Sequence, residues 1–225
     1  MTANDQHQAP IPLAATVVLL HDGPQGLQVL MLRRREDLAF YGGAWVFPGG
    51  CVDSIDYGDG GVNEAARRAA VREVHEEAGL RVEPAQLCHF AQWVTPPGRT
   101  RRYDTFFFVA RLPDLRITLD EREVDAHRLL SPQEALQAHR RGELKIPPPT
   151  FVTLLMLQDH EDVQQALTAF GDSPPQRFQP RPVKSNGRMI YLYEPDSGYP
   201  HHDPNTPGKR HRLIANGTDW IYERS

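Results

Sequence analysis

Three glutamates near the middle of the chain have the residue type and the spacing to hold a metal ion. Glu73, Glu76 and Glu77, called the acidic triplet below, fall at positions i, i+3 and i+4, so in a helix their carboxylates share one face within about one turn. Like charges at these spacings repel, and acids in the last helical turn oppose the macrodipole, which costs roughly 0.3 to 1 kcal/mol apiece. A cationic partner is therefore expected.

One arginine cannot supply all of that charge. Arg72 can bridge to Glu76 at i+4, but a single guanidinium does not neutralise three carboxylates. A divalent cation is the simplest remaining partner, and oxygen ligands favour a hard ion such as Mg²⁺ or Mn²⁺. The alternative is a solvated acidic helix face, which is the commoner fate of acidic triplets.

The residues around the acidic triplet favour the metal site because they form a long motif. Gly58, Glu64 and the run from Arg72 to Leu80 resemble the Nudix box, Gly-x5-Glu-x7-Arg-Glu-U-x-Glu-Glu-x-Gly-U, in which U is a bulky aliphatic residue. Every fixed position is matched, and chance agreement at seven named and two aliphatic positions is negligible in a chain of 225 residues. The sequence thus resembles the Nudix hydrolase family.

One departure from the family pattern concerns the glycines. The second glycine of a Pro-Gly-Gly turn usually opens the motif, but here Pro48-Gly49-Gly50 ends eight residues before Gly58. Gly58 satisfies the spacing by coincidence or because residues 51–58 loop out and return. Which glycine approaches the metal is left open at this point.

The resemblance implies a fold, a reaction and a cofactor. The fold would be a Nudix-type α/β/α sandwich around a mixed β-sheet, and the reaction would be hydrolysis of a nucleoside diphosphate linked to another group. Mg²⁺ or Mn²⁺ would withdraw charge from the diphosphate and lower the pKa of a bound water. Arg72 would orient the carboxylates, and the implied metal ligands are Glu73, Glu76, Glu77, Glu64 and the carbonyl of Gly49. An exposed acid that suits the helix dipole is the alternative for Glu64.

A later acidic loop is the expected source of one more catalytic group. Members of the family often draw a further carboxylate, sometimes the general base, from such a loop, and Glu121 and Glu123 lie where it should be. A solvated acidic loop explains these two residues equally well.

Four further residues are candidates for substrate binding. Arg101 and Arg102 belong to a concentrated basic stretch in a turn, and the planar guanidinium suits phosphate recognition. A soluble hairpin tip is the alternative. Phe40 and Trp45 could stack on a base, although core packing is the commoner fate of aromatic residues.

The positioning elements follow from periodicity. Apolar and small residues recur at spacings of three and four over residues 63–78, and Gly79 offers a stop, so this segment is predicted to be the helix that carries the acidic triplet. Strands are predicted over residues 15–21, 27–33, 44–47, 87–94, 104–111 and 123–130. Ser131 begins a capping box for a helix to about residue 140, and helices are predicted over 150–157 and 161–170. This order indicates an α/β fold.

The chain divides by composition near residue 170. Residues 1–170 carry 17 Lys and Arg against 23 Asp and Glu, whereas residues 171–225 carry 8 against 6 and hold eight prolines. Asn186-Gly187 and Asn216-Gly217 each lie between strand-like runs, which predicts two hairpins. The expected organisation is a flexible N-terminus (1–11), a Nudix hydrolase domain (12–170) and a Pro-rich, hairpin-containing C-terminal extension (171–225) packed on it.

Composition excludes several classes of protein. The formal charge of -4 argues against binding to the nucleic-acid backbone, and the longest apolar run is of strand length, which excludes a membrane helix. Two cysteines are too few for a disulfide framework, and the opening residues do not resemble a signal peptide, so the cytoplasm is expected. The expected partner is a small nucleotide-diphosphate substrate, and a homodimer is left open.

Softer similarities concern the substrate. The long insertion after residue 50 and the stretches 93–97, 102–108 and 148–150 resemble the acyl-coenzyme A diphosphatase branch of the family. They imply coenzyme A or an acyl derivative as the substrate. An ADP-ribose or nucleotide-sugar pyrophosphatase, or a non-catalytic regulatory Nudix domain, is the alternative.

Overall fold

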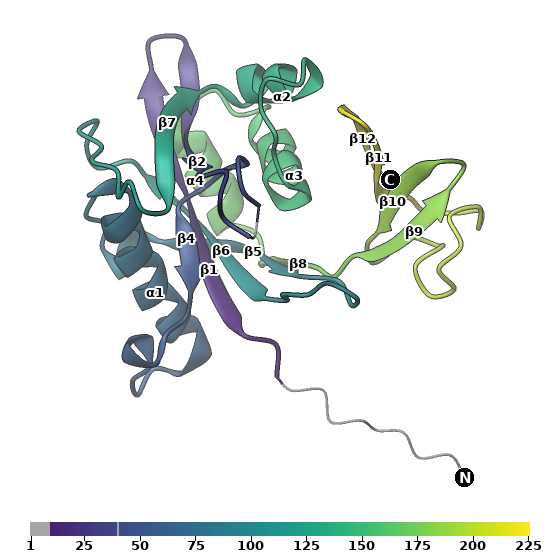
Figure 1. The fold of residues 1–225 in the computed structure, drawn as a ribbon, viewed down its shortest axis with the longest axis horizontal. Coiled ribbons are helices and arrows are strands. Elements are labelled where there is room, and N and C mark those ends of the chain that lie inside the picture. Colours follow the sequence, from purple (N-terminus) through teal and green to yellow (C-terminus); the bar gives the residue numbers. More distant parts are fainter. Residues whose placement is uncertain (1–9, 40) are drawn as a thin grey trace.

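The computed structural model describes residues 10–39 and 41–225, so only the last two residues of the predicted N-terminal segment 1–11 belong to it. Two β-sheets and four α-helices are built from this part of the chain (Figure 1). The larger sheet contains β1 (Leu13–Gly23), β2 (Gly26–Arg34), β3 (Trp45–Val46), β4 (Gly49–Cys51), β5 (Cys88–Val94), β6 (Asp104–Arg111), β7 (Val124–Leu130) and β8 (Gln176–Phe178). The α-helices are α1 (Gly61–Ala78), α2 (Pro132–Arg140), α3 (Pro148–Leu157) and α4 (Val163–Gly171).

The larger sheet is mixed. Its strands follow the order β3-β2-β1-β6-β5-β8, with β4 also paired to β1 and β7 to β2. The pairs β1–β6 and β5–β8 are parallel, whereas the others, such as β1–β2 and β5–β6, are antiparallel. Strands β4 and β7 come from distant parts of the chain, and each pairs with one of the neighbouring strands β1 and β2.

Helices cover both faces of this sheet. Alternate residues of a strand point to opposite faces, so Val17 and Leu19 of β1 pack with α1, whereas Val18 and Leu20 pack with α3 and α4. Figure 1 shows α1 alone on one side and the other three helices across the sheet. The predicted α/β/α sandwich is confirmed.

Small residues let α1 lie close to the sheet. Its buried face is mostly alanine, namely Ala65, Ala66, Ala69, Ala70 and Ala78. The helix ends at Gly79, which has a φ of 68° and whose amide donates to the His75 carbonyl at 2.9 Å. A Cβ atom there would meet Thr118, so the loop after β6 packs tightly against the end of α1.

The C-terminal extension contributes to both sheets. Its strand β8 pairs in parallel with β5. The second sheet, of order β12-β11-β10-β9, contains β9 (Arg181–Ser185), β10 (Arg188–Leu192), β11 (His211–Asn216) and β12 (Asp219–Arg224). Both predicted hairpins are confirmed, and at the first one Asn186 and Gly187 adopt φ values of 48° and 75°.

The differences from the predicted elements lie where the sequence has no period. The strand-like run before Asn186-Gly187 is not continuous, because β8 ends at Phe178 and β9 begins only after Pro180. Two short 3₁₀ helices, η1 (Ser54–Asp56) and η2 (Pro84–Gln86), and the strand β4 were not predicted. In the described part of the chain no helix combines the length and the apolar character needed to cross a membrane.

Candidate active site

The acidic triplet lies on the last turns of α1, as predicted. The three side chains differ in burial: Glu77 is 4% exposed, and the side chains of Glu73 and Glu76 are 15% and 52% exposed. The structure therefore brings together one buried, one mostly buried and one solvent-facing carboxylate, which form a graded acidic surface at the end of the helix.

The Gly49-Gly50 pair lies directly against this surface. The backbone N–H of Gly49 donates to Oε2 of Glu77 at 2.9 Å, and β4 is held in place by its pairing with β1. A Cβ atom on Gly50 would overlap the carboxylate of Glu73, so a larger residue there would displace that side chain. Gly58 instead lies beside Arg68. The glycines that approach the carboxylates are thus those of the Pro-Gly-Gly turn.

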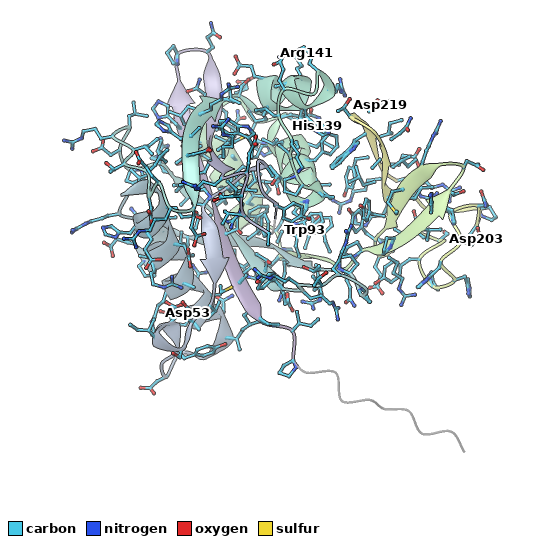
Figure 2. All side chains as sticks on the ribbon, viewed as in Figure 1. Asp53, Trp93, His139, Arg141, Asp203 and Asp219 are labelled. Atoms are coloured by element: carbon cyan, nitrogen blue, oxygen red, sulfur yellow. The ribbon has the colours of Figure 1, made fainter. Side chains whose placement is uncertain are left out.

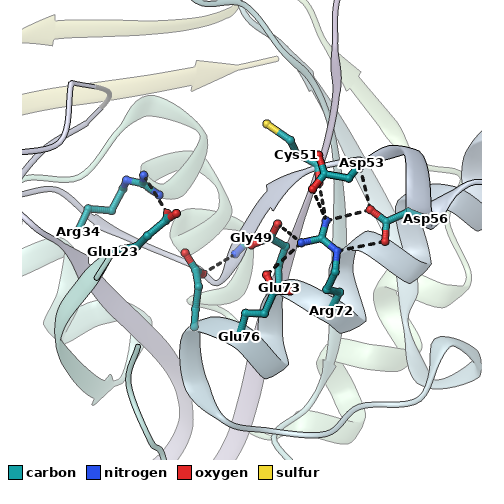
Figure 3. A network of polar contacts seen from close by, with 10 residues as sticks. Arg34, Gly49, Cys51, Asp53, Asp56, Arg72, Glu73, Glu76 and Glu123 are labelled. Atoms are coloured by element: carbon teal, nitrogen blue, oxygen red, sulfur yellow. Dashed lines mark hydrogen bonds and ion pairs between the residues drawn. The ribbon is translucent and has the colours of Figure 1, made fainter. Parts of the chain in front are cut away.

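Arg72 lies at the centre of the polar network in Figure 3. Its Nη1 donates to Glu73 at 2.7 Å and to Glu76 at 3.0 Å, and its Nη2 donates to the Cys51 carbonyl at 2.9 Å. Its two remaining N–H groups donate to Asp56, from Nε at 3.2 Å and from Nη2 at 2.8 Å. All five guanidinium donors are used, which fixes the orientation of the side chain.

Asp56 is the residue of this network that the sequence reasoning missed. It lies in the insertion after β4, is 4% exposed and also accepts the backbone N–H of Asp53 at 2.8 Å. Asp53, at the lower end of the view in Figure 2, is a more distant partner of Arg72 at 3.6 Å. The signal in the sequence is the position of Asp56, six residues after Gly50.

Burial makes the deepest carboxylates hard to ionise. Desolvation raises the pKa of Glu77 to about 8, although the Gly49 N–H partly offsets it, and the charge of Glu73 raises it further. Burial likewise raises the pKa of Glu73, against the opposing effect of Arg72. The charge of Glu123 adds to both shifts, so this third carboxylate faces the same surface.

The donor chemistry fits a divalent cation. The network holds more carboxylates than guanidinium groups. Within residues 10–39 and 41–225, no three His, Cys, Asp or Glu side chains lie close enough together in this structure to hold a metal ion. Arg72 lies between the Glu73 and Glu76 carboxylates and supplies part of the compensating charge. The acidic triplet would hold a hard ion through oxygen atoms.

The predicted loop carboxylates reach the site to different degrees. The side chain of Glu123 is 57% exposed and lies 3.6 Å from Nη2 of Arg34. For Glu121 the contact is made by the backbone, whose carbonyl accepts Nη1 of Arg35 at 3.1 Å. Of the two, Glu123 is the one whose charge acts on the acidic triplet. The catalytic role of either residue stays a prediction.

Glu64 is not brought together with the acidic triplet. It lies nine residues before Glu73 on the same helix, about 14 Å along the axis, and forms an i,i+4 ion pair with Arg68 at 3.6 Å. Its predicted role as a metal ligand stays a prediction.

The structure describes three of the four predicted substrate residues. Phe40 lies outside the described residues. Trp45 is 5% exposed, with the guanidinium of Arg128 5.0 Å from its ring centre, so the structure shows core packing for it. Arg102 donates to the Thr95 carbonyl at 3.1 Å, and Arg101 is exposed. Their contact with a substrate stays a prediction.

Curated relatives match this chain at modest identity. "Putative nudix hydrolase 7" of Caenorhabditis elegans is 24% identical over 199 residues, which cover 72% of this chain and 66% of that protein. "Acyl-coenzyme A diphosphatase NUDT19" of Gallus gallus is 28% identical over 61% of this chain and 38% of its own length. "Peroxisomal coenzyme A diphosphatase ndx-8" of C. elegans is 38% identical over 68 residues, which are 30% of this chain and 26% of that protein. The matches span less than two thirds of these relatives.

Solved structures share the fold. A NUDIX hydrolase from Alicyclobacillus acidocaldarius superposes with a TM-score of 0.63 at 23% identity and covers 73% of this chain and 99% of its own. The family model described as "NUDIX domain" matches residues 10–149, which is more than half of the chain. Together with the acidic triplet on α1 and the Pro-Gly-Gly turn against it, this match shows that the chain belongs to the Nudix family of hydrolases.

Proposed function

We propose that this chain hydrolyses a diphosphate linkage in a nucleoside diphosphate derivative, with Mg²⁺ or Mn²⁺ held by the acidic triplet. The observation that carries the proposal is the buried carboxylate of Glu77, which lies beside Glu73 and for which, within residues 10–39 and 41–225, the Gly49 N–H is the one direct donor. Such a pair is costly without a cation, and a divalent ion is the partner that a diphosphate also requires.

Different residues of the chain would orient the metal ligands and accept a proton during hydrolysis. When bound, the ion supplies Lewis-acid polarisation of the phosphate and lowers the pKa of a bound water. Arg72 holds the carboxylates of Glu73 and Glu76 at 2.7 and 3.0 Å, so their orientation is set before substrate binds. Glu123, mostly solvent-exposed at the rim of the same surface, is the carboxylate that we assign to accept a proton from water.

We infer that coenzyme A or an acyl-coenzyme A is the substrate. Two of the relatives named above are described as diphosphatases of these compounds. Hydrolysis of the diphosphate linkage would release 3',5'-ADP and phosphopantetheine or its acyl form. A non-catalytic regulatory role is disfavoured because Glu73, Glu76 and Glu77 are all present.

A substrate panel tests the proposal. The purified chain is incubated with Mg²⁺ or Mn²⁺ and, separately, coenzyme A, an acyl-coenzyme A, ADP-ribose, NADH or a diadenosine polyphosphate, and the products are resolved by chromatography. Turnover of coenzyme A compounds far above the others is expected. Turnover of ADP-ribose alone would contradict the coenzyme A assignment but keep the hydrolase. No turnover of any compound with either ion would contradict both.

A further inference from the structure

The loop that follows β4 carries a buried carboxylate, Asp56, that accepts several hydrogen bonds. Asp56 is 4% exposed, and its two oxygens receive Nε and Nη2 of Arg72 in a bidentate pair at 3.2 and 2.8 Å. Oδ2 also accepts the N–H of Asp53 at 2.8 Å, and the Asp56 carbonyl accepts Nη1 of Arg68 at 3.3 Å. Hydrogen bonds therefore hold both the side chain and the backbone carbonyl of Asp56 in place.

The spacing between Gly50 and Asp56 is the same as the spacing between the first glycine and the first glutamate of the motif. Gly50 and Asp56 are separated by five residues, as are the glycine and the glutamate that open the Nudix box. Fifteen residues then separate Asp56 from Arg72, which is eight more than the seven of the motif. Gly50 touches Glu73 and Asp56 holds Arg72, whereas Gly58 and Glu64 both lie against Arg68.

We propose that Asp56 is a positioning residue that fixes Arg72 and, through it, the carboxylates of Glu73 and Glu76. Gly50 and Asp56 then take the places of the first glycine and the first glutamate of the motif. The eight additional residues of this chain fall between Asp56 and Arg72, and Glu64 is left on the far part of α1. This inference rests on the proposed function, because it concerns how the same site holds its ion.

The geometry explains how a residue remote from the ion would act. Two of the five donors of Arg72 are aimed at Asp56, so the guanidinium plane cannot rotate while that pair is intact. The same plane directs Nη1 at both triplet residues that it contacts. An asparagine at position 56 would present an N–H group to one of the arginine donors and open the pair.

The first test compares variants in their affinity for Mn²⁺ without any substrate, measured by electron paramagnetic resonance and calorimetry. Asp56→Asn is expected to weaken Mn²⁺ binding about 10- to 100-fold, in the range of other residues that orient metal ligands. Glu64→Gln tests the alternative assignment, and it is expected to lose less affinity for Mn²⁺ than Asp56→Asn. Glu143→Gln is the matched control, because it opens an exposed arginine–carboxylate pair, with Arg141, far from α1. Loss in Glu64→Gln as large as in Asp56→Asn would overturn the assignment.

A second test separates positioning from general support of the fold. In a double-mutant cycle with Arg72→Lys, the Asp56→Asn change should add little to the loss already caused by Arg72→Lys, because both act through one contact. Turnover should fall in kcat with a smaller change in KM for the substrate. Full additivity of the two losses, or a fall confined to thermal stability, would overturn the proposal.

Two further measurements decide the remaining cases. If Asp56→Asn does not fold, Asp56→Glu replaces it, and this variant should bind Mn²⁺ within about tenfold of the parent chain; a folded Asp56→Glu as weak as Arg72→Lys would contradict the proposal. If the parent chain binds no Mn²⁺, the proposed function fails. The Asp56 assignment is then tested in the ion-free protein by the Nε–H resonance of Arg72, which should shift in Asp56→Asn and not in Glu64→Gln. The reverse pattern would overturn it.

Discussion

The backbone N–H of Gly49 donates a 2.9 Å hydrogen bond to Oε2 of Glu77, a carboxylate that is 4% exposed. This contact joins two parts of the chain that are 28 residues apart. It also supplies one neutral donor to a group that burial makes hard to ionise, since the pKa of Glu77 is raised to about 8. A single N–H does not offset the loss of water around a carboxylate, so ionisation and ion binding are coupled at this residue.

The affinity for a divalent ion should therefore depend on pH. Below about pH 8 a proton and the ion compete for Glu77, so the affinity for Mg²⁺ or Mn²⁺ is expected to rise with pH and to level off above about 8. Calorimetric titrations between pH 6 and pH 9 measure this directly. In Glu77→Gln the affinity should be lower and its rise with pH weaker. An affinity that is flat across this range in the parent chain would contradict the raised pKa.

The same residue should lower the stability of the ion-free protein at alkaline pH. Because the folded pKa lies above the unfolded value of 4.5, the contribution of Glu77 to stability is greatest below about pH 4.5 and is lost as the pH rises towards 8. Glu77→Gln is therefore expected to raise the melting temperature of the ion-free chain at pH 8 and to change it less at pH 5. Thermal unfolding in a metal chelator checks the sign, and a variant that is less stable at pH 8 would refute it.

A substitution at Glu76 should lower catalysis without lowering the stability of the fold. Its side chain is 52% exposed and bonded to Arg72, so Glu76→Gln removes one predicted ligand while leaving the core intact. We expect kcat to fall by roughly 10²-fold or more at saturating Mg²⁺, with the melting temperature nearly unchanged. Glu143→Gln, an exposed carboxylate outside the site, serves as the control. Equal activity of Glu76→Gln and the parent chain would show that the acidic triplet is not the site.

The elements with a clear period could be predicted from the sequence. The helix predicted over residues 63–78 is α1, which begins two residues earlier, and the strand predicted over 104–111 has the bounds of β6. The capping box at Ser131 is also confirmed, with both reciprocal bonds to Glu134 present. These features depend on contacts within one turn or one strand, so local sequence contains the information that determines them.

The parts that could not be predicted depend on tertiary contacts. The strand β4 has only three residues, two of them glycine, and forms because β1 offers it a partner. The sequence marks Asp56 only by its distance from Gly50, and its bond to Arg72, sixteen residues later, exists only after the insertion folds back onto α1. The acidic triplet, by contrast, was predictable because its three members share one helix face. Spacing within an element was readable, whereas contacts across elements were not.

One tryptophan contributes to the docking of the C-terminal extension, beside the pairing of β8 with β5. Trp220 of β12 packs edge-on against His139 of α2 and Phe151 of α3, with ring centres 4.7 and 5.2 Å away, at the side of the molecule where Figure 2 labels His139 and Asp219. Trp220→Ala should lower the free energy of unfolding by about 3 kcal/mol. Ile221→Ala is the control, because this neighbour is 48% exposed. Urea unfolding measures both, and equal effects would mean that the contact contributes nothing specific.

A buried ion pair inside the C-terminal extension should make its stability sensitive to acid. Asp196 is 2% exposed and pairs with Arg212 at 2.7 and 2.8 Å, while the N–H groups of His211 and Gly198 donate to it at 2.9 and 2.8 Å. Burial alone would raise the pKa of Asp196, but these bonds outweigh it and hold the pKa below its ordinary 3.8. The contribution to stability is thus complete above about pH 4 and is lost as the pH falls through the folded pKa.

Asp196→Asn should accordingly destabilise the chain by about 3 to 5 kcal/mol at pH 7, because it leaves the Arg212 guanidinium buried without its counter-charge. The difference between variant and parent should shrink as the pH is lowered towards 2, since protonation then opens the pair in the parent as well. Thermal unfolding from pH 2 to pH 7 follows both chains, with Asp219→Asn, an exposed carboxylate of the same extension, as the control. A difference in stability that stays constant over this range would mean that protonation of Asp196 is not linked to folding. The contribution of Asp196 to the stability of the chain would then come from its bonds to backbone N–H groups alone.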